Sequence, residues 1–241
     1  MTEQLSSWLS GCAENTVVQV IGFNHKAFAD SLFSCYQIEK PHRYSYWAVK
    51  RKAEFLAGRI AADKALKLLG YSDFIVQIGL HRSPVWPAGV SGSISHSDDC
   101  AIAIVSAENC LLGVDIEETL LSKESISVFL SEKEQALIRN QGVRNTNKNW
   151  LFTAVFSAKE SLFKALYPLV KRYIDFDYAE LIGIEDQKLR FKLATTETLQ
   201  QGAVSGRLPA ELSVYYRLLE VKKNQYAVIT LAKADLEKQA L

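Results

Sequence analysis

Two carboxylates stand two residues apart in the segment GVDIE at residues 113–117. If this segment is a strand, Asp115 and Glu117 point to the same side, because side chains alternate along a strand. Like charges this close repel each other unless a cation lies between them. Magnesium prefers hard oxygen ligands, so the pair suggests a metal site. Two solvated acids on an exposed edge strand would explain the same pattern, and the pair alone leaves both interpretations open.

A third acid, Glu160, lies between Lys159 and Lys164 in the segment FSAKESLFK at residues 156–164. On a helix Glu160 and Lys164 are about one turn apart, and such a pair is usually a surface ion pair. Alternatively, this helix binds phosphate, and its two lysines supply the positive charge. A third acid near the first two would favour the metal site.

Further residues could bind phosphate. Ser95 and His96 follow the Gly-rich run GVSG at residues 89–92, and they offer a hydroxyl, backbone N–H groups and an imidazole. Arg51 and Arg59 are about two turns apart on a predicted helix and could bind another phosphate with their forked guanidinium groups. A single histidine beside a strand more often has a structural role, and arginines on an exposed helix face often only contact solvent. Neither Ser95 with His96 nor Arg51 with Arg59 therefore identifies a site by itself.

The elements that must position these residues begin with residues 46–69, which are rich in Ala, Leu and Lys and end before Gly70. This pattern predicts a helix. Residues 79–97 contain two prolines and three glycines, which predicts a long ordered loop. Residues 100–106 and 111–117 then predict two strands of a hairpin at the seam between two halves.

In the second half, Ser131 and Glu134 have the spacing of a capping box, which predicts a helix over residues 131–140. Residues 142–149 indicate a loop, and residues 150–167 a longer helix that ends before Pro168. Residues 212–220 and 225–232 predict a second hairpin. A helix and a hairpin in each half predict an α+β fold with two similar subdomains, although no sequence repeat demonstrates it.

The composition is that of a globular protein: 241 residues, of which 48% are hydrophobic and 23% charged. A net charge of +1 argues against a general nucleic-acid binder. No segment has the pattern of a signal peptide or of a transmembrane helix, so we expect a cytoplasmic protein. The four cysteines and four histidines are scattered, which argues against a disulfide framework and against zinc.

Four segments, taken in order, resemble the 4′-phosphopantetheinyl transferases of the surfactin-synthetase-activating type. They are residues 51–66, 83–97, 113–118 and 156–168, and their order makes the resemblance specific. It implies two similar α/β subdomains related by a pseudo-twofold axis. Residues 1–113 would bind the nucleotide and 3′-phosphate of coenzyme A, and residues 114–241 would carry Mg²⁺ and the catalytic helix. The active site would lie in the cleft between them.

The resemblance also assigns roles to individual residues. The metal ligands would be Asp115, Glu117 and Glu160, with Ile116 facing the ion through its backbone. The catalytic residues would be Glu160, which is also the candidate general base, Lys159, Asp115 and Glu117. Coenzyme A would contact Arg51, Arg59, Arg82, Ser83, Pro84, Ser95, His96, Asp115, Lys159 and Lys164. One departure is Phe156, because many members have Trp at that position.

The reaction implied by the resemblance transfers 4′-phosphopantetheine from coenzyme A to a serine of an apo carrier protein and releases adenosine 3′,5′-bisphosphate. We expect aryl or peptidyl carrier domains of a nonribosomal siderophore synthetase as the acceptor, with acyl carrier proteins as a further option. Both halves of the site lie in one chain, so a monomer is expected. Three alternatives stay open: a non-catalytic coenzyme A binding module, another Mg²⁺-dependent phosphotransfer enzyme, and a purely structural protein.

Overall fold

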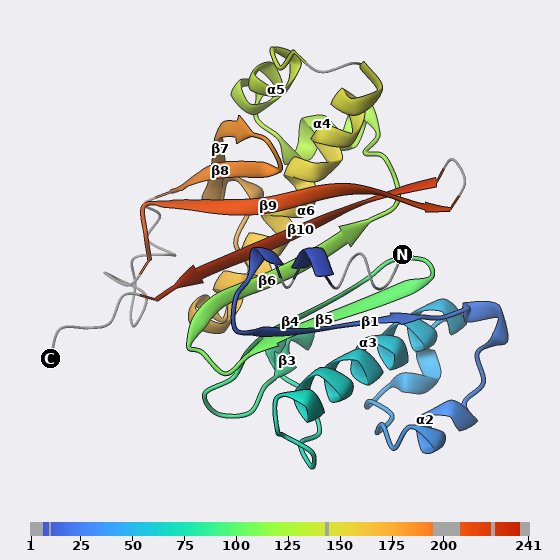
Figure 1. Ribbon diagram of the computed structural model, residues 1–241. Coiled ribbons are helices and arrows are strands. Elements are labelled where there is room, and N and C mark those ends of the chain that lie inside the picture. Colours follow the sequence, from blue (N-terminus) through green and yellow to red (C-terminus); the bar gives the residue numbers. More distant parts are fainter. Residues whose placement is uncertain (1–6, 10, 143–144, 195–207, 223–224, 237–241) are drawn as a thin grey trace, which may run out of the picture. The chain divides into compact units, whose positions relative to one another are not determined.

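The computed structural model describes residues 7–9, 11–142, 145–194, 208–222 and 225–236 (Figure 1). The chain divides into two compact units, Met1–Asn109 and Cys110–Leu241. Each unit is an antiparallel sheet packed against one long helix, which confirms the predicted α+β class and the two similar subdomains. The boundary predicted after residue 113 falls inside strand β6, Cys110–Glu117. Among the described residues, no helix is long and apolar enough to cross a membrane.

The first unit is built on a three-stranded sheet in the order β1-β5-β4 (Figure 1). Its strands are β1, Thr16–Gly22, β4, Ser91–His96, and β5, Cys100–Ser106. Helix α3, Val49–Leu68, packs on this sheet through small residues such as Ala61 and Ala65. The helix ends as predicted before Gly70, whose φ of +96° is a conformation that favours glycine.

Smaller elements of the first unit surround this helix and sheet. They are η1, His25–Ala27, α2, Ser31–Cys35, η2, Tyr44–Tyr46, η3, Leu80–Arg82, and the two-stranded pair β2, Gln77–Ile78, with β3, Pro84–Val85. An aromatic cluster of Phe33, Tyr44, Trp47 and Phe55 joins the segment before α3 to the helix itself. This cluster holds the segment before α3, and residues 36–43 of that segment form one wall of the pocket described below.

The second unit contains a five-stranded sheet in the order β6-β10-β9-β8-β7 (Figure 1). Its further strands are β7, Ala179–Glu185, β8, Lys188–Leu193, β9, Glu211–Lys222, and β10, Gln225–Asp235. Its helices are α4, Lys123–Phe129, α5, Glu132–Arg139, the 3-10 turn η4, Phe176–Tyr178, and the long α6, Asn145–Val170. Helix α6 packs against β6 and β10, and the main apolar core lies between helix and sheet.

Two sequence predictions about pairing had different outcomes. The hairpin of β9 with β10 is confirmed, although residues 223–224 of its turn lie outside the described residues. The hairpin of β5 with β6 is wrong, because β5 pairs with β1 and β4 while β6 pairs with β10 in the other sheet. Both edges of β5 are already occupied within its own unit, so strands that are neighbours in sequence belong to different sheets.

Local predictions also need correction. The expected loop over residues 79–97 contains β3 and β4, which pair with β2 and β5. A Cβ atom at Gly92 would clash with the Trp86 ring, so glycine lets this ring lie against β4. Helix α6 begins at Asn145 and includes Pro168, which was expected to end it. Proline near the end of a helix removes only one N–H donor, and the backbone bond from Lys171 to Tyr167 still closes the last turn. The capping box of Ser131 and Glu134 is confirmed.

Gly113 lies where β6 closely approaches the backbone of α6. A Cβ atom built there would lie 1.9 Å from the backbone oxygen of Ser161 and 2.9 Å from the backbone nitrogen of Ala165. Both neighbours are backbone atoms of a long helix, so neither can move without shifting the helix. The short contact is therefore a reason for glycine at this position.

Gly113→Ala is expected to lower the free energy of unfolding by an amount at the upper end of the range for overpacking, about 3 kcal/mol. The matched control is Gly142→Ala, because a Cβ atom at Gly142 meets nothing within 4 Å. Urea unfolding of both variants measures the difference. An alanine at residue 113 that is as stable as the control would contradict the contact.

Candidate active site

A pocket of about 880 Å³ lies in the first unit, a size typical of small-molecule sites. It is bordered by residues 36–43, by one face of α3, by residues 72–78 and by the end of β4. Five of the residues that the sequence assigned to coenzyme A line it: Arg51, Arg59, Arg82, Pro84 and His96. The structure thus brings together candidates from three separate segments of the chain.

Arg51 and His96 are in direct contact in this pocket. The distance from Arg51 Nη1 to His96 Nε2 is 2.7 Å, although the residues are 45 apart in sequence. A guanidinium has no acceptor, so His96 Nε2 accepts this hydrogen bond. Glu54 lies behind them with its Oε2 3.5 Å from Arg51 Nη1 and 3.8 Å from His96 Nε2. A nearly buried carboxylate therefore orients Arg51, and Arg51 in turn holds His96, so that both can bind a phosphate.

Arg59 is buried, with 7% of its surface exposed. Its Nη2 donates to the backbone oxygen of Gln77 at 3.4 Å, and its guanidinium lies 4.9 Å from the centroid of the Phe55 ring. Within the described part of the chain, its Nε has no hydrogen-bond partner. Burial, and then the nearby Arg51, lower the pKa of Arg59 to about 10, so the side chain is still a cation at neutral pH. A buried cation beside a pocket favours an anionic ligand.

Two of the predicted residues in the first unit do not line the pocket. Ser83 Oγ donates to the backbone oxygen of Leu80, and Ser95 is buried within β4. Sequence reasoning missed four basic residues of the pocket wall: Lys67 on α3, and Lys40, His42 and Arg43 in the segment before it. The clustering of the last three as KPHR, three basic residues within four positions, was a signal that could have found them.

The second unit holds the predicted acidic residues on β6 and α6. Asp115 is 5% exposed, so the interpretation as a solvated edge-strand acid is wrong for this residue. Its Oδ2 accepts a hydrogen bond from Ser157 Oγ, and its Oδ1 accepts one from Lys164 Nζ, both at 2.7 Å. Lys164 thus forms an ion pair with Asp115 across the helix–strand interface. Ile116 is buried in β6 and pairs with Ile229.

The charges of Asp115 and Lys164 shift the pKa values of the other two acids, Glu117 and Glu160. Burial, and then the Asp115 carboxylate, raise the pKa of Glu117 to about 7. Burial also raises the pKa of Glu160; Lys164 opposes this shift and Asp115 adds to it. The accumulated negative charge and the hard oxygen donors fit Mg²⁺. Among the described residues the three carboxylates do not all approach within 4.8 Å of one another, so binding an ion requires rotation of at least one side chain.

Comparison with known proteins decides the family. Residues 42–106 match the 4′-phosphopantetheinyl transferase N-terminal domain, and residues 111–215 match the 4′-phosphopantetheinyl transferase superfamily. Enterobactin synthase component D of Salmonella typhi is 39% identical over 188 residues, which are 77% of this chain and 73% of that protein. The chain belongs to the 4′-phosphopantetheinyl transferase superfamily.

Other members of the superfamily match over shorter segments. Enterobactin synthase component D of Escherichia coli (strain K12) is 43% identical over 119 residues, 48% of this chain. The chain spans about half the length of that relative, 55%. The 4′-phosphopantetheinyl transferase Svp of Streptomyces mobaraensis is 36% identical over 135 residues, 55% of this chain and 54% of that protein. The predicted likeness to component D is confirmed.

Lys159, which the sequence predicted to bind phosphate, is buried and paired with a carboxylate. It is 2% exposed, and its Nζ lies 2.7 Å from Glu134 Oε1 and donates to the backbone oxygen of Phe176 at 2.9 Å. Glu134 also caps α5 and accepts from the backbone N–H of Leu181. In this structure Lys159 therefore joins α5, α6 and the segment before β7, and its contact with phosphate stays a prediction.

Phe156, which departs from the pattern implied by the resemblance, lies in an aromatic cluster. Its ring stacks on Phe176, with centroids 5.6 Å apart, and the centroid of the Phe129 ring lies 4.8 Å away.

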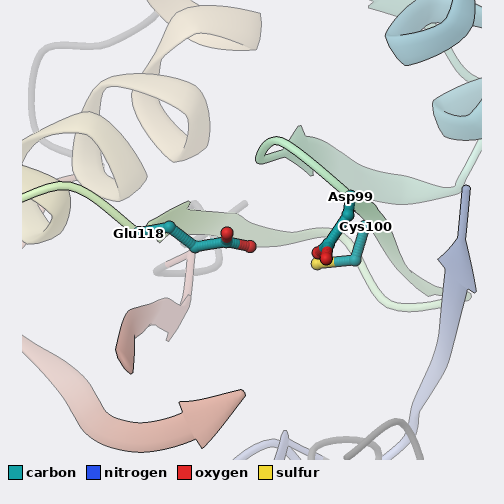
Figure 2. Close-up of side chains that lie close together, drawn as sticks. All are labelled: Asp99, Cys100 and Glu118. Atoms are coloured by element: carbon teal, nitrogen blue, oxygen red, sulfur yellow. The ribbon is translucent and has the colours of Figure 1, made fainter. Parts of the chain in front are cut away.

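Three further side chains are shown in Figure 2: Asp99 and Cys100, which point to the same side at the start of β5 in the first unit, and Glu118, which follows β6 in the second. Glu118 adds slightly to the raised pKa of Glu117. The first two belong to the first unit, and none of the three was a sequence candidate.

Proposed function

We propose that this chain transfers 4′-phosphopantetheine from coenzyme A to a serine of an apo carrier protein. The observation that carries the proposal is the acidic group of Asp115, Glu117 and Glu160, held on β6 and α6 of a 4′-phosphopantetheinyl transferase superfamily member. In the reaction, the serine oxygen forms a bond to the β-phosphorus of coenzyme A. The bond from that phosphorus to the bridging oxygen breaks, and adenosine 3′,5′-bisphosphate leaves.

The residues divide this chemistry between binding and proton transfer. Arg51, Arg59 and His96 bind the phosphorylated nucleotide in the pocket of the first unit. Glu160 accepts the proton of the serine hydroxyl as the general base. Without a bound ion, burial raises the pKa of this carboxyl group. Lys164 offsets the negative charge near Asp115 and so favours phosphate there. Phosphoryl transfer depends mainly on this kind of alignment and charge neutralisation.

Asp115, Glu117 and Glu160 would hold Mg²⁺, with the backbone of Ile116 facing the ion. When bound, Mg²⁺ would offset the charge of the pyrophosphate oxygens of coenzyme A. The fit rests on the donor chemistry: three carboxylates gather negative charge near Lys164, and two of them have a raised pKa.

The acceptor we propose is an aryl or peptidyl carrier domain of a nonribosomal siderophore synthetase. The support is the name of the relatives, enterobactin synthase component D. The name of Svp does not specify an acceptor, so acyl and other peptidyl carriers belong in the test. With both sets of site residues in one chain, we propose a monomer that acts in the cytoplasm on coenzyme A and a carrier.

The experiment is intact-mass analysis of apo aryl, peptidyl and acyl carrier proteins after incubation with this chain, coenzyme A and Mg²⁺. We expect a gain of one phosphopantetheine group, about 340 Da, that disappears when EDTA is added. Coenzyme A binding without any mass gain would indicate a binding module instead. Release of another product from coenzyme A would indicate a different Mg²⁺-dependent phosphotransfer enzyme.

Arg51→Ala is expected to weaken coenzyme A binding about tenfold or more, since a hydrogen bond to a charged group is worth about 1.5–3 kcal/mol. If Arg51 binds the 3′-phosphate, dephospho-coenzyme A, which lacks it, should bind wild type and variant alike. Calorimetric titration with both ligands makes this comparison. An equal loss for both ligands would place Arg51 elsewhere on the nucleotide.

A further inference from the structure

We infer that Thr230 and Ser161 are positioning residues for Asp115, acting through Ser157. This inference rests on the proposed function, because it concerns the carboxylate assigned to the metal. Ser157 and Ser161 lie one turn apart on α6, and Thr230 lies opposite Asp115 in the register of β10 with β6. All three hydroxyl-bearing residues are 0% exposed, so water cannot replace their hydrogen bonds.

The hydroxyl groups form a continuous chain. Ser161 Oγ lies 2.7 Å from Thr230 Oγ1, Thr230 Oγ1 lies 2.9 Å from Ser157 Oγ, and Ser157 Oγ lies 2.7 Å from Asp115 Oδ2. Ser161 Oγ also donates to the backbone oxygen of Thr230 at 3.2 Å, so its single proton is shared between the carbonyl and the nearer hydroxyl of Thr230. The chain therefore extends from the middle of α6, through β10, to the carboxylate on β6.

Counting protons gives the chain a direction. The Asp115 carboxylate, which is paired with Lys164, can only accept, so Ser157 donates its single proton to it. Ser157 must then accept from Thr230, and Thr230, having used its own proton, must accept from Ser161. Every hydroxyl donates toward Asp115, and hydrogen bonds arranged in this way polarise and strengthen one another.

The direction gives the two remote hydroxyls a role at Asp115. Ser157 keeps its donor directed at Asp115 while its own oxygen accepts a hydrogen bond from Thr230. In the same way, Thr230 keeps its donor directed at Ser157 while its oxygen accepts from Ser161. Removing a remote link leaves Ser157 free to rotate away, and Asp115 loses one of the contacts that fix its orientation. Groups that orient a ligating carboxylate commonly change metal affinity by 10–100-fold when they are replaced.

The test replaces Thr230 by Val, which has the same branched shape and lacks the hydroxyl. We expect Thr230→Val to weaken Mn²⁺ binding, measured by the EPR signal of free Mn²⁺, by roughly tenfold. Coenzyme A affinity in the absence of metal should be unchanged. Thr230→Ser should retain the affinity of wild type, because serine restores the link. A purely structural role would not produce this split.

Thr153→Val is the matched control, since Thr153 is also 0% exposed on α6 but its hydroxyl bonds the backbone N–H of Leu121 instead. If Thr230→Val does not fold, Ser161→Ala tests the far end of the chain. Mn²⁺ affinity in Thr230→Val or Ser161→Ala equal to that of Thr153→Val would overturn the inference. Wild type that binds no Mn²⁺ and modifies no carrier would overturn the proposed function together with it.

Discussion

Glu160→Gln is expected to reduce the rate of carrier modification by a factor of about 10²–10⁴, the usual contribution of a general base. Glutamine keeps the shape of the side chain but cannot accept the serine proton. The raised pKa of Glu160, caused mainly by burial, shows that the surroundings favour proton uptake at this carboxyl group. The measurement is the initial rate of the mass gain on an apo carrier protein at saturating coenzyme A and Mg²⁺.

The control for Glu160→Gln is Glu180→Gln, which removes one negative charge from an exposed position on β7. We expect this control to keep the wild-type rate. Mn²⁺ titration of Glu160→Gln separates the two proposed roles: unchanged affinity with lost activity indicates a base, whereas lost affinity indicates a metal ligand. A rate within threefold of wild type would exclude both roles.

Lys159→Met is expected to lower the free energy of unfolding by about 3–5 kcal/mol, the usual effect of removing one partner of a buried ion pair. The carboxylate of Glu134 would stay buried, with 3% of its side chain exposed, and without its ammonium partner. The backbone oxygen of Phe176 would lose a donor as well. Urea unfolding without coenzyme A measures the change, so ligand binding cannot contribute.

Lys148→Met is the control on the same helix, because Lys148 donates to the backbone oxygen of Arg139 in an exposed contact. We expect it to stay within about 0.5 kcal/mol of wild type. The double variant Lys159→Met with Glu134→Gln should be more stable than the sum of the two single effects predicts. If Lys159→Met keeps its stability but loses coenzyme A affinity, the phosphate-binding role predicted for Lys159 is favoured instead.

Much of the local structure could be predicted from the sequence. The Ala-rich run before Gly70 predicts α3, and the spacing of Ser131 and Glu134 predicts the start of α5, because these signals act within a few residues. Local signals wrongly predicted a hairpin of β5 with β6. Two apolar strands joined by a short polar turn are typical of a hairpin, and only the occupation of both edges of β5 by other strands excludes it.

The sequence by itself determined the chemical types available for the site, the order of the four segments that identify the superfamily, helices α3, α5 and α6, and strands β5, β6, β9 and β10. Only the tertiary structure decided which side chains meet. Arg51 contacts His96 across 45 residues, Asp115 accepts from Ser157 across 42, and Ser157 reaches Thr230 across 73. Such contacts depend on how sheets and helices pack, and a local pattern does not contain that information. For the same reason Lys159, adjacent to Glu160 in sequence, pairs instead with Glu134.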